Sequence, residues 1–240
     1  MRGVFFVVHA ETSGHSTDSE SVEEEWPMLR ALIQLADLHG HRLTLEFQPQ
    51  WPKYALANAE SLTEMRGWEA TGHEIALHHH GVSHVAWDGY TNAVGYQHRE
   101  DYRGTVDDAV ALLQAVSRRG GPVTAGMTDE DTDWHPDLAY ATGGSGQDGG
   151  GLMSVPMLQE YRGTTVTQVF YQGYSLDRSI EASLDDIESA LANAKSDEVI
   201  GFVTHPFDYV RNPESFKALF DLLAQYGVTL DTVATILDGD

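Results

Sequence analysis

Histidines are concentrated in one short stretch of this sequence, where His78-His79-His80 is followed by His84. Imidazole together with carboxylate is a suitable ligand set for zinc or a similar divalent ion. His80 and His84 are four residues apart, and on one turn of helix that spacing turns both rings to the same side. The stretch therefore predicts a divalent metal site with zinc favoured, and a solvated histidine run is the alternative.

Two further polar groups follow apolar runs elsewhere in the chain. His9-Ala10-Glu11 comes after Val4 to Val8, and Thr204 to Asp208, with His205, comes after Val199 to Val203. In parallel α/β folds the carboxyl ends of the strands build the site, so the groups are expected to converge. Glu11 is then a candidate third metal ligand, and His205 a candidate acid for a leaving group.

The elements that must position these residues alternate between strands and helices. Short apolar or branched runs predict strands, and capping boxes with helical spacing predict helices. The alternation predicts a single domain over residues 1–240, an α/β fold with a largely parallel sheet that is closed or nearly closed into a barrel. Strands are expected at 4–8, 42–47, 74–77, near 123, 165–171 and 199–204, and helices at 21–36, 61–72, 105–118, 183–194 and 213–226.

Composition narrows the partners and the chemistry. Lysine plus arginine number 14 against 37 aspartate plus glutamate, giving a formal charge of −23. That charge argues against nucleic acid or an anionic membrane and favours a neutral substrate or a cationic product. With no cysteine, a metal must be held by histidine or carboxylate.

The same composition bears on location. The first apolar run, Val4 to Val8, is too short for a signal peptide or a membrane span, so the expected location is cytoplasmic. An acidic surface with only three lysines suits high salt, and an ordinary acidic cytosolic protein is the equal alternative.

Three loop features have less specific interpretations. The acidic tract Asp129 to Asp133 is expected to be solvated rather than to bind a cation. A glycine-rich loop is expected from Gly143 to Gly151. Four aromatic residues could either stack on a sugar or pack in the protein, and they are Trp87, Tyr90, Trp134 and Tyr174.

The segment from Gly72 to His84 resembles a known signature. Gly72-His73-Glu74-Ile75-Ala76-Leu77-His78 with the histidine pair that follows resembles the polysaccharide deacetylase family, whose motif reads Gly-His-Glu-Ile-x-x-His-x-x-x-His at the end of a barrel strand. The likeness continues in order through most of the chain, at Arg103 to Ala125, Val155-Pro156, Phe202 to Asp208, Tyr226-Gly227-Val228 and Thr232.

The resemblance implies a distorted, mostly parallel (β/α) barrel of about seven strands. It also implies a metal-dependent hydrolase that removes acetyl or similar acyl groups from the amide nitrogen of a carbohydrate. A divalent metal, often zinc, would be held by Glu11, His80 and His84, with His78 as the alternate because strict alignment places Val82 at the second histidine. His205 would be the acid. Two alternatives stay open, a catalytically silent carbohydrate-binding relative and a hydrolase of non-sugar amides such as cyclic imides or ureides.

The sequence departs from the family pattern where the catalytic base is expected. The family has paired aspartates after its first strand, and this chain has His9-Ala10-Glu11, which makes His9 one candidate for the base. The family's arginine that orients the base aligns with Thr124. These departures imply that the base machinery differs from that of the family.

Overall fold

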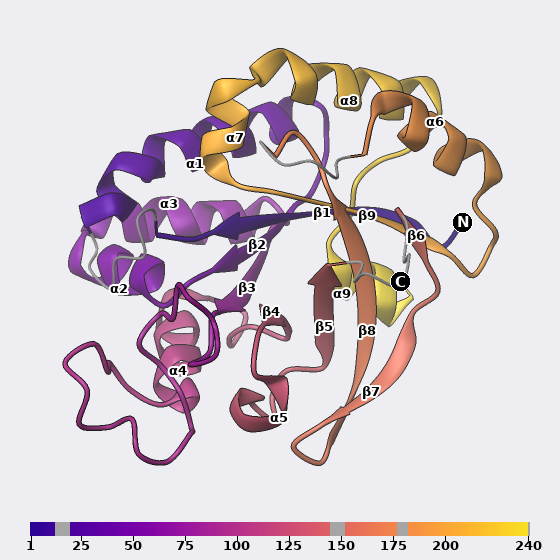
Figure 1. Cartoon of the computed structure of the whole chain (residues 1–240). Helices are drawn as coiled ribbons and strands as arrows, with labels where there is room; N and C mark the ends of the chain where they lie inside the picture. Colours follow the sequence, from indigo (N-terminus) through magenta and orange to yellow (C-terminus); the bar gives the residue numbers. More distant parts are fainter. Residues whose placement is uncertain (13–19, 145–151, 177–181, 240) are drawn as a thin grey trace.

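The computed structural model describes residues 1–12, 20–144, 152–176 and 182–239, and Figure 1 shows their arrangement. The strands are β1 (Gly3–Ala10), β2 (Thr44–Phe47), β3 (Glu74–His79), β4 (Thr124–Met127), β5 (Tyr140–Gly144), β6 (Met153–Ser154), β7 (Met157–Tyr161), β8 (Thr164–Gly173) and β9 (Val199–Thr204). The helices are α1 (Glu20–Leu38), α2 (Gln50–Ala57), α3 (Ala59–Ala70), α4 (Val106–Val116), α5 (Glu130–Asp133), α6 (Leu184–Asn193), α7 (Pro206–Arg211), α8 (Pro213–Gln225) and α9 (Val233–Asp238).

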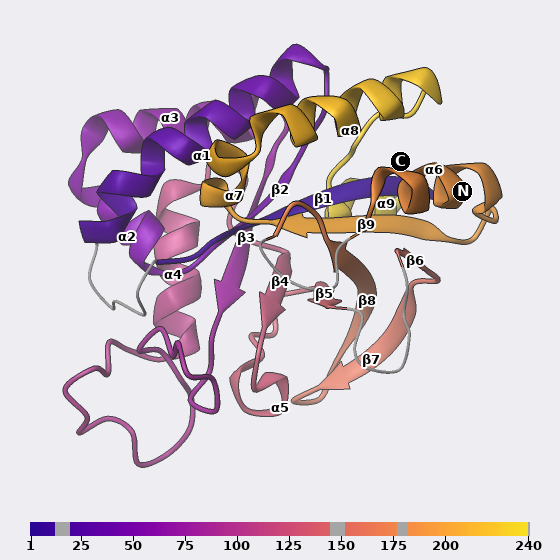
Figure 2. The ribbon, with the colours of Figure 1, turned by 45° about the horizontal axis from the view of Figure 1, so that its top comes forward.

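Seven parallel strands close into a barrel in the order β1, β2, β3, β4, β5, β8 and β9, and β9 pairs back onto β1. Two antiparallel strands are added, β6 on β9 and β7 on β8. The β7–β8 hairpin projects beyond the barrel, as Figures 1 and 2 show. The predicted fold class, a single α/β domain with a mostly parallel barrel of about seven strands, is confirmed.

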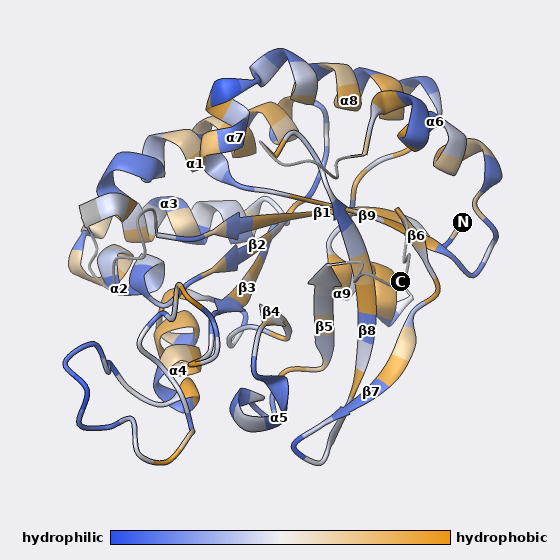
Figure 3. Cartoon of the chain, viewed as in Figure 1, coloured by the Kyte–Doolittle hydropathy of each residue, from blue (hydrophilic) through white to orange (hydrophobic). Residues whose placement is uncertain are grey.

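Successive side chains of β1 alternate between the barrel interior and the layer of helices around it. Phe5 and Val7 belong to an inner apolar cluster with residues of β8, β9 and α9, whereas Val4, Phe6 and Val8 pack with the helices outside. Successive strand residues point to opposite faces, so the odd-numbered positions of β1 continue into the barrel. Figure 3 shows apolar stretches along β1 and β9 between the amphipathic helices.

The helix predicted at 105–118 is found as α4, whereas the helix predicted at 61–72 begins earlier in the chain. Thr105 caps α4 in a complete capping box with Asp108. Helix α3 begins before position 61 because Asn58 caps it by accepting from the backbone N–H groups of Glu60 and Ser61. The short helices α2, α5, α7 and α9 were not predicted, since one or two turns give too little periodicity.

The loop expectations had different outcomes. Asp133 is fully buried, so solvation of the acidic tract is wrong for that residue. The four aromatic residues considered for sugar stacking are all buried, with Trp87 the most exposed at 8%. Of the expected glycine-rich loop, Gly143 and Gly144 end β5, and positions 145–151 lie outside the described residues. Among the helices that the structure describes, none is long and apolar enough to cross a membrane.

Candidate metal centre

The three polar groups predicted at strand ends meet at one mouth of the barrel. His9 lies in β1, with Glu11 just beyond it, while His78 lies in β3 and His80 directly follows that strand. His205 follows β9 and precedes α7. Because these strands are parallel neighbours, their carboxyl ends open at the same end of the barrel.

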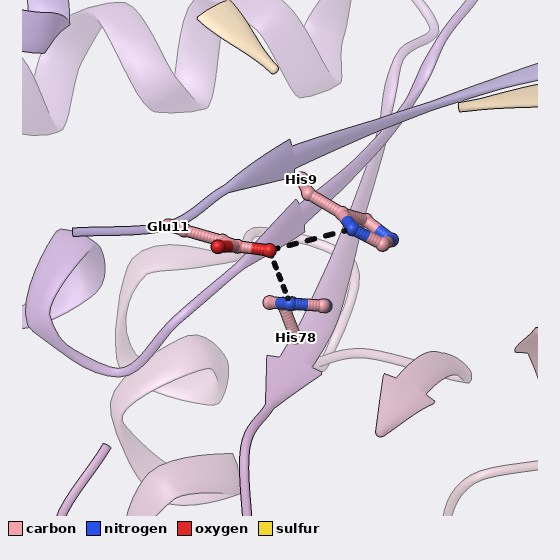
Figure 4. Close-up of side chains that lie close together, drawn as sticks. All are labelled: His9, Glu11 and His78. Atoms are coloured by element: carbon pink, nitrogen blue, oxygen red, sulfur yellow. Dashed lines mark hydrogen bonds and ion pairs between the residues drawn. The ribbon is translucent and has the colours of Figure 1, made fainter. Parts of the chain in front are cut away.

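One carboxylate oxygen, Glu11 Oε1, lies at the centre of four imidazoles. It is 3.1 Å from His78 Nε2, 3.4 Å from His205 Nε2, 3.6 Å from His9 Nδ1 and 3.7 Å from His80 Nε2. Figure 4 shows His9 and His78 turned toward Glu11. Four rings from three strand ends are thus directed at one point.

In His80 and His205, the ring nitrogen that faces away from Glu11, Nδ1, has its own contact. His80 Nδ1 lies 3.2 Å from the carbonyl oxygen of Ala86, and His205 Nδ1 lies 2.9 Å from Asp208 Oδ2. Asp208 reaches back because it stands in the first turn of α7, three residues after His205. Asp208 therefore orients the His205 ring with a hydrogen on Nδ1, while His80 Nδ1 is shared between the Ala86 carbonyl and the amide nitrogen of Gln48, which lies 3.2 Å away.

Glu11 and the imidazoles shift one another's pKa. Burial alone raises the pKa of Glu11, but contacts with His205, His78 and His9 hold it well below its ordinary value. Burial and the neighbouring His78 lower the pKa of His80 to about 2. Burial lowers the pKa of His205, yet Asp208 and Glu11 outweigh it and leave that pKa raised. His80 is thereby neutral and suited to coordination, whereas the raised pKa of His205 favours its protonated form.

The predicted helical spacing of His80 and His84 is not found, because residues 82–86 form turns and a bend after β3. The ring of His84 packs on His80 with 3.9 Å between centroids, and its Nδ1 accepts from the backbone N–H of Ala86. Among the described residues, His84 is not one of the histidines within 4.0 Å of Glu11. It lies beside the centre and lines the same cavity.

The donor set fits a divalent metal. His9, Glu11 and His78 form a group whose ligand atoms all lie within 4.8 Å of one another, and this group could hold a metal ion. His80 adds Nε2 at 3.0 Å from His78 Nε2. Buried imidazoles and a partly exposed carboxylate at such distances match the ligand types of zinc and related ions.

A cavity of about 460 Å³ opens over the centre. It is large enough for a small ligand such as a sugar. Its lining combines the histidines and Glu11 with Glu130, Gln168, Phe170 and Tyr171. Within the described part of the chain, no lysine or arginine lines it.

Sequence reasoning missed the carboxylate below the histidines. Glu46 in β2 is fully buried, with Oε2 at 3.2 Å from His9 Nε2 and 3.5 Å from His78 Nδ1. A charged residue between Leu45 and Phe47 in a buried strand is the signal that could have revealed it. The roles of Asp208 and of Tyr171, whose hydroxyl lies 3.2 Å from His9 Nε2, were also not predicted.

Thr124, aligned with the family's arginine, does not lie at this centre. Its hydroxyl donates to Glu74, the first residue of β3. The β4 residue beside His78 is Gly126. The side chain beside His9, the candidate base, is therefore the carboxylate of Glu46 in β2, and β4 contributes no side chain there.

The barrel fold is similar to that of solved structures that include a provisionally assigned polysaccharide deacetylase, which confirms the expected likeness at the level of fold. A provisionally assigned polysaccharide deacetylase from Mycobacterium smegmatis is similar over 98% of this chain and 88% of its own, with a TM-score of 0.58 and 18% identity. The PuuE allantoinase is similar over 99% of this chain and 89% of its own, with a TM-score of 0.59 and 14% identity.

A third similar structure belongs to a larger enzyme. The 4-alpha-glucanotransferase from Thermococcus litoralis matches 98% of this chain with a TM-score of 0.63 and 12% identity, and this chain spans 40% of its length. The sequence itself matches no protein-family model and no curated protein. The likeness therefore shows the barrel fold.

Proposed function

We propose that this protein is a metal-dependent hydrolase that removes an acetyl or similar acyl group from the amide nitrogen of a carbohydrate. The convergence of four imidazoles on Glu11 Oε1 at the mouth of the barrel carries the proposal. The similar fold of the Mycobacterium smegmatis protein supports it. A lining without lysine or arginine among the described residues suits an uncharged sugar.

In this proposal Glu11, His78 and His80 hold a divalent ion, with zinc favoured. These three residues offer one carboxylate and two imidazoles whose Nε2 atoms are 3.0 Å apart. When bound, the ion supplies Lewis-acid polarisation of the acyl carbonyl. His84 then supports His80 through ring packing.

His9 and His205 are the proposed base and acid. Burial lowers the pKa of His9, but Glu11 and Glu46 outweigh it, so His9 is a stronger base than an isolated imidazole. His9 Nδ1 would take a proton as water attacks the carbonyl carbon. His205 Nε2 would donate a proton to the nitrogen as the C–N bond breaks, giving a carboxylic acid and an amine.

Acetate release tests the proposal. Protein stripped of metal with a chelator and then reloaded with zinc is incubated with N-acetylated mono- and disaccharides. We expect zinc-dependent acetate release that His205→Ala slows by at least about 100-fold. No acetate with or without zinc, together with measurable sugar binding, would replace the enzyme by a carbohydrate-binding protein.

Hydrolysis of a non-sugar amide is the second candidate. The similar fold of the PuuE allantoinase favours it, as does the replacement of a carboxylate base by His9. The same protein samples are incubated with cyclic imides and with ureides, including allantoin, and ring opening is followed by chromatography. Ring opening without acetate release from any sugar would make this second candidate the function.

A further inference from the structure

Glu130 lies in the wall of the cavity, apart from the histidines. Two carboxylates line the cavity in the described part of the chain, Glu11 and Glu130. Glu11 lies among the histidines, whereas Glu130 forms no ion pair with any histidine, lysine or arginine of the described residues. Its carboxylate is therefore available to a bound molecule.

The short helix α5 directs Glu130 inward. Glu130 and Asp133 are three residues apart and lie on the same side of the helix. Asp133 is fully buried and its carboxylate contacts His79 at 3.1 Å, whereas Asp131 and Thr132 are exposed. Glu130 is half-buried because it shares the inner side of the helix with Asp133. Figure 2 shows α5 at the end of the β7–β8 hairpin, and the helix contacts β7.

Hydrogen bonds fix the start of α5 to the loop after β3. Asp129, which precedes the helix, has a left-handed backbone with a φ of 62°, a conformation uncommon for residues other than glycine. Its side chain accepts from the backbone N–H of Ser83 at 2.8 Å and from the Ser83 hydroxyl. The hydroxyl of Thr128 accepts from the backbone N–H of Gly81 at 2.8 Å. Glu130 is thereby held at a defined place beside the loop that follows the histidines.

The surroundings of Glu130 favour a positively charged ligand. Burial raises the pKa of its carboxyl group, and the carboxylates of Asp129 and Asp131 raise it further against a hydrogen bond from the backbone of Glu130 itself. The carboxylate is thus partly removed from water and lies near other negative charges. A cation bound beside it would offset both effects.

The strand β8 offers groups suited to an uncharged sugar ring in the same cavity. Gln168 and Phe170 are two residues apart, so their side chains lie on one face of the strand. A Cβ atom at Gly143 would lie 3.2 Å from Gln168 Nε2 and 3.7 Å from the ring of Phe170. All three residues line the cavity. An amide beside an aromatic ring can donate to a hydroxyl group while the ring packs on a sugar face.

We infer that the substrate is an amino sugar that carries a free ammonium group next to the acylated unit, and that Glu130 is the residue that selects it. The acylated unit, which is uncharged, would lie at the histidine centre, and no lysine or arginine of the described residues lines the cavity there. The ammonium group of the adjoining unit would donate to the Glu130 carboxylate. Such charge-assisted hydrogen bonds are about twice as strong as neutral ones. The reaction rests on the proposed function, whereas recognition of the ammonium group does not require hydrolysis.

Two disaccharides that differ in a single group test this inference. Both carry one acetylated amine, and the second ring carries a free amine in the first compound and a hydroxyl group in its counterpart. At a pH below the pKa of the free amine, we expect zinc-loaded wild type to have a kcat/KM at least about tenfold higher for the compound with the amine, mainly through a lower KM. Glu130→Gln should bring the two kcat/KM values within about twofold of each other.

Asp131→Asn is the matched control. It removes a negative charge from the adjacent position, but Asp131 is exposed and does not line the cavity. Solvent screens such a charge, so the preference for the amine should stay within about twofold of that of the wild type. An equal loss of preference in Glu130→Gln and Asp131→Asn would assign it to the overall acidic surface and overturn the role of Glu130.

Binding gives a readout that requires neither zinc nor activity. Calorimetric titration of zinc-free wild type with the same two compounds should give a Kd at least about tenfold lower for the compound with the amine. Similar Kd values for the two compounds would overturn the inference, even if Glu130→Gln failed to fold. A preference in Kd that depends on Glu130, together with no acetate release from either compound, would refute the proposed hydrolysis and leave the ammonium site supported.

Discussion

His78 Nε2 lies 3.0 Å from His80 Nε2, inside the ring of histidines around Glu11. Two imidazole nitrogens this close require either a hydrogen between them or a cation that both coordinate. His78 lies in β3, and His80 comes immediately after His79, the last residue of that strand. Because strand side chains alternate, residues 78 and 80 point to the same side and residue 79 points away.

This pair predicts which histidines are needed for metal binding. His78→Ala and His80→Ala should each lower zinc affinity by at least about 100-fold, because each leaves fewer than three ligands. His84→Ala should lower it by less than about fivefold, since His84 only packs on His80. Zinc content after dialysis and calorimetric titration measure the difference, with circular dichroism to confirm folding. A loss with His84→Ala as large as that with His78→Ala would instead support the pair His80 and His84.

The barrel was predictable because its strands are short, apolar and separated by helical periodicity. The runs at Val4 to Val8 and Val199 to Val203 became the neighbouring strands β1 and β9. Barrel closure depends on the pairing of β8 with β9. The short helix α9 packs its apolar residues into the inner cluster with Phe5 and Val7, a long-range contact that local periodicity does not encode.

The sequence predicted that polar residues at three strand ends lie close together, but it did not predict which of their side chains contact one another. A spacing of four residues favoured His80 with His84 under the assumption of a helical turn, whereas the chain there continues a strand and then turns. Glu46 was missed because its partners, His9 and His78, come from other strands. At the positions where the polysaccharide deacetylase motif that the sequence resembles has a carboxylate base and an arginine, this chain has His9 with the buried carboxylate of Glu46 beneath it.

Asp208 is predicted to act through His205. Asp208→Asn should lower kcat by about 100-fold with little change in KM or zinc content, since Asp208 holds His205 Nδ1 at 2.9 Å and lies away from the Glu11 side of the ring. The double variant with His205→Ala should be no slower than His205→Ala alone, because both act on one step. Steady-state kinetics test this, and additive losses in the double variant would separate the two residues.

A buried network behind the site is predicted to stabilise the long segment between β3 and α4. His79 donates toward Asp88 at 2.8 Å and Asp133 at 3.1 Å, and these carboxylates outweigh burial and raise the pKa of His79 to about 10. Asp133→Ala leaves the fully buried His79 short of a partner and should lower the free energy of unfolding by about 3 to 5 kcal/mol.

Asp131→Ala is the control for that prediction, since Asp131 belongs to the same acidic tract but is exposed. It should change stability by less than about 0.5 kcal/mol. Urea unfolding followed by tryptophan fluorescence measures both variants. Equal effects of the two substitutions would show that the tract acts through its net charge and that the bond to His79 contributes nothing.

Glu74 provides a pH-dependent prediction away from the histidines. Burial raises the pKa of its carboxyl group to about 7, against the hydrogen bonds from Thr124, Ala234 and Thr44. The folded state therefore favours the neutral acid, whereas the unfolded chain ionises near pH 4.5. Folding stability from this group is fully present below pH 4.5, falls as the pH rises toward 7, and stays at its lower value above 7.

Comparison with Glu74→Gln isolates that effect, because glutamine does not ionise. The free energy of unfolding of the wild type minus that of the variant should fall by about 2 to 3 kcal/mol between pH 4.5 and 7.5. Glu60→Gln, at an exposed position of α3, should show no such trend. Urea unfolding at half-unit pH steps measures all three proteins. A difference between wild type and Glu74→Gln that stays constant over this range would mean that the carboxyl group is already ionised near pH 4.5 in the folded protein.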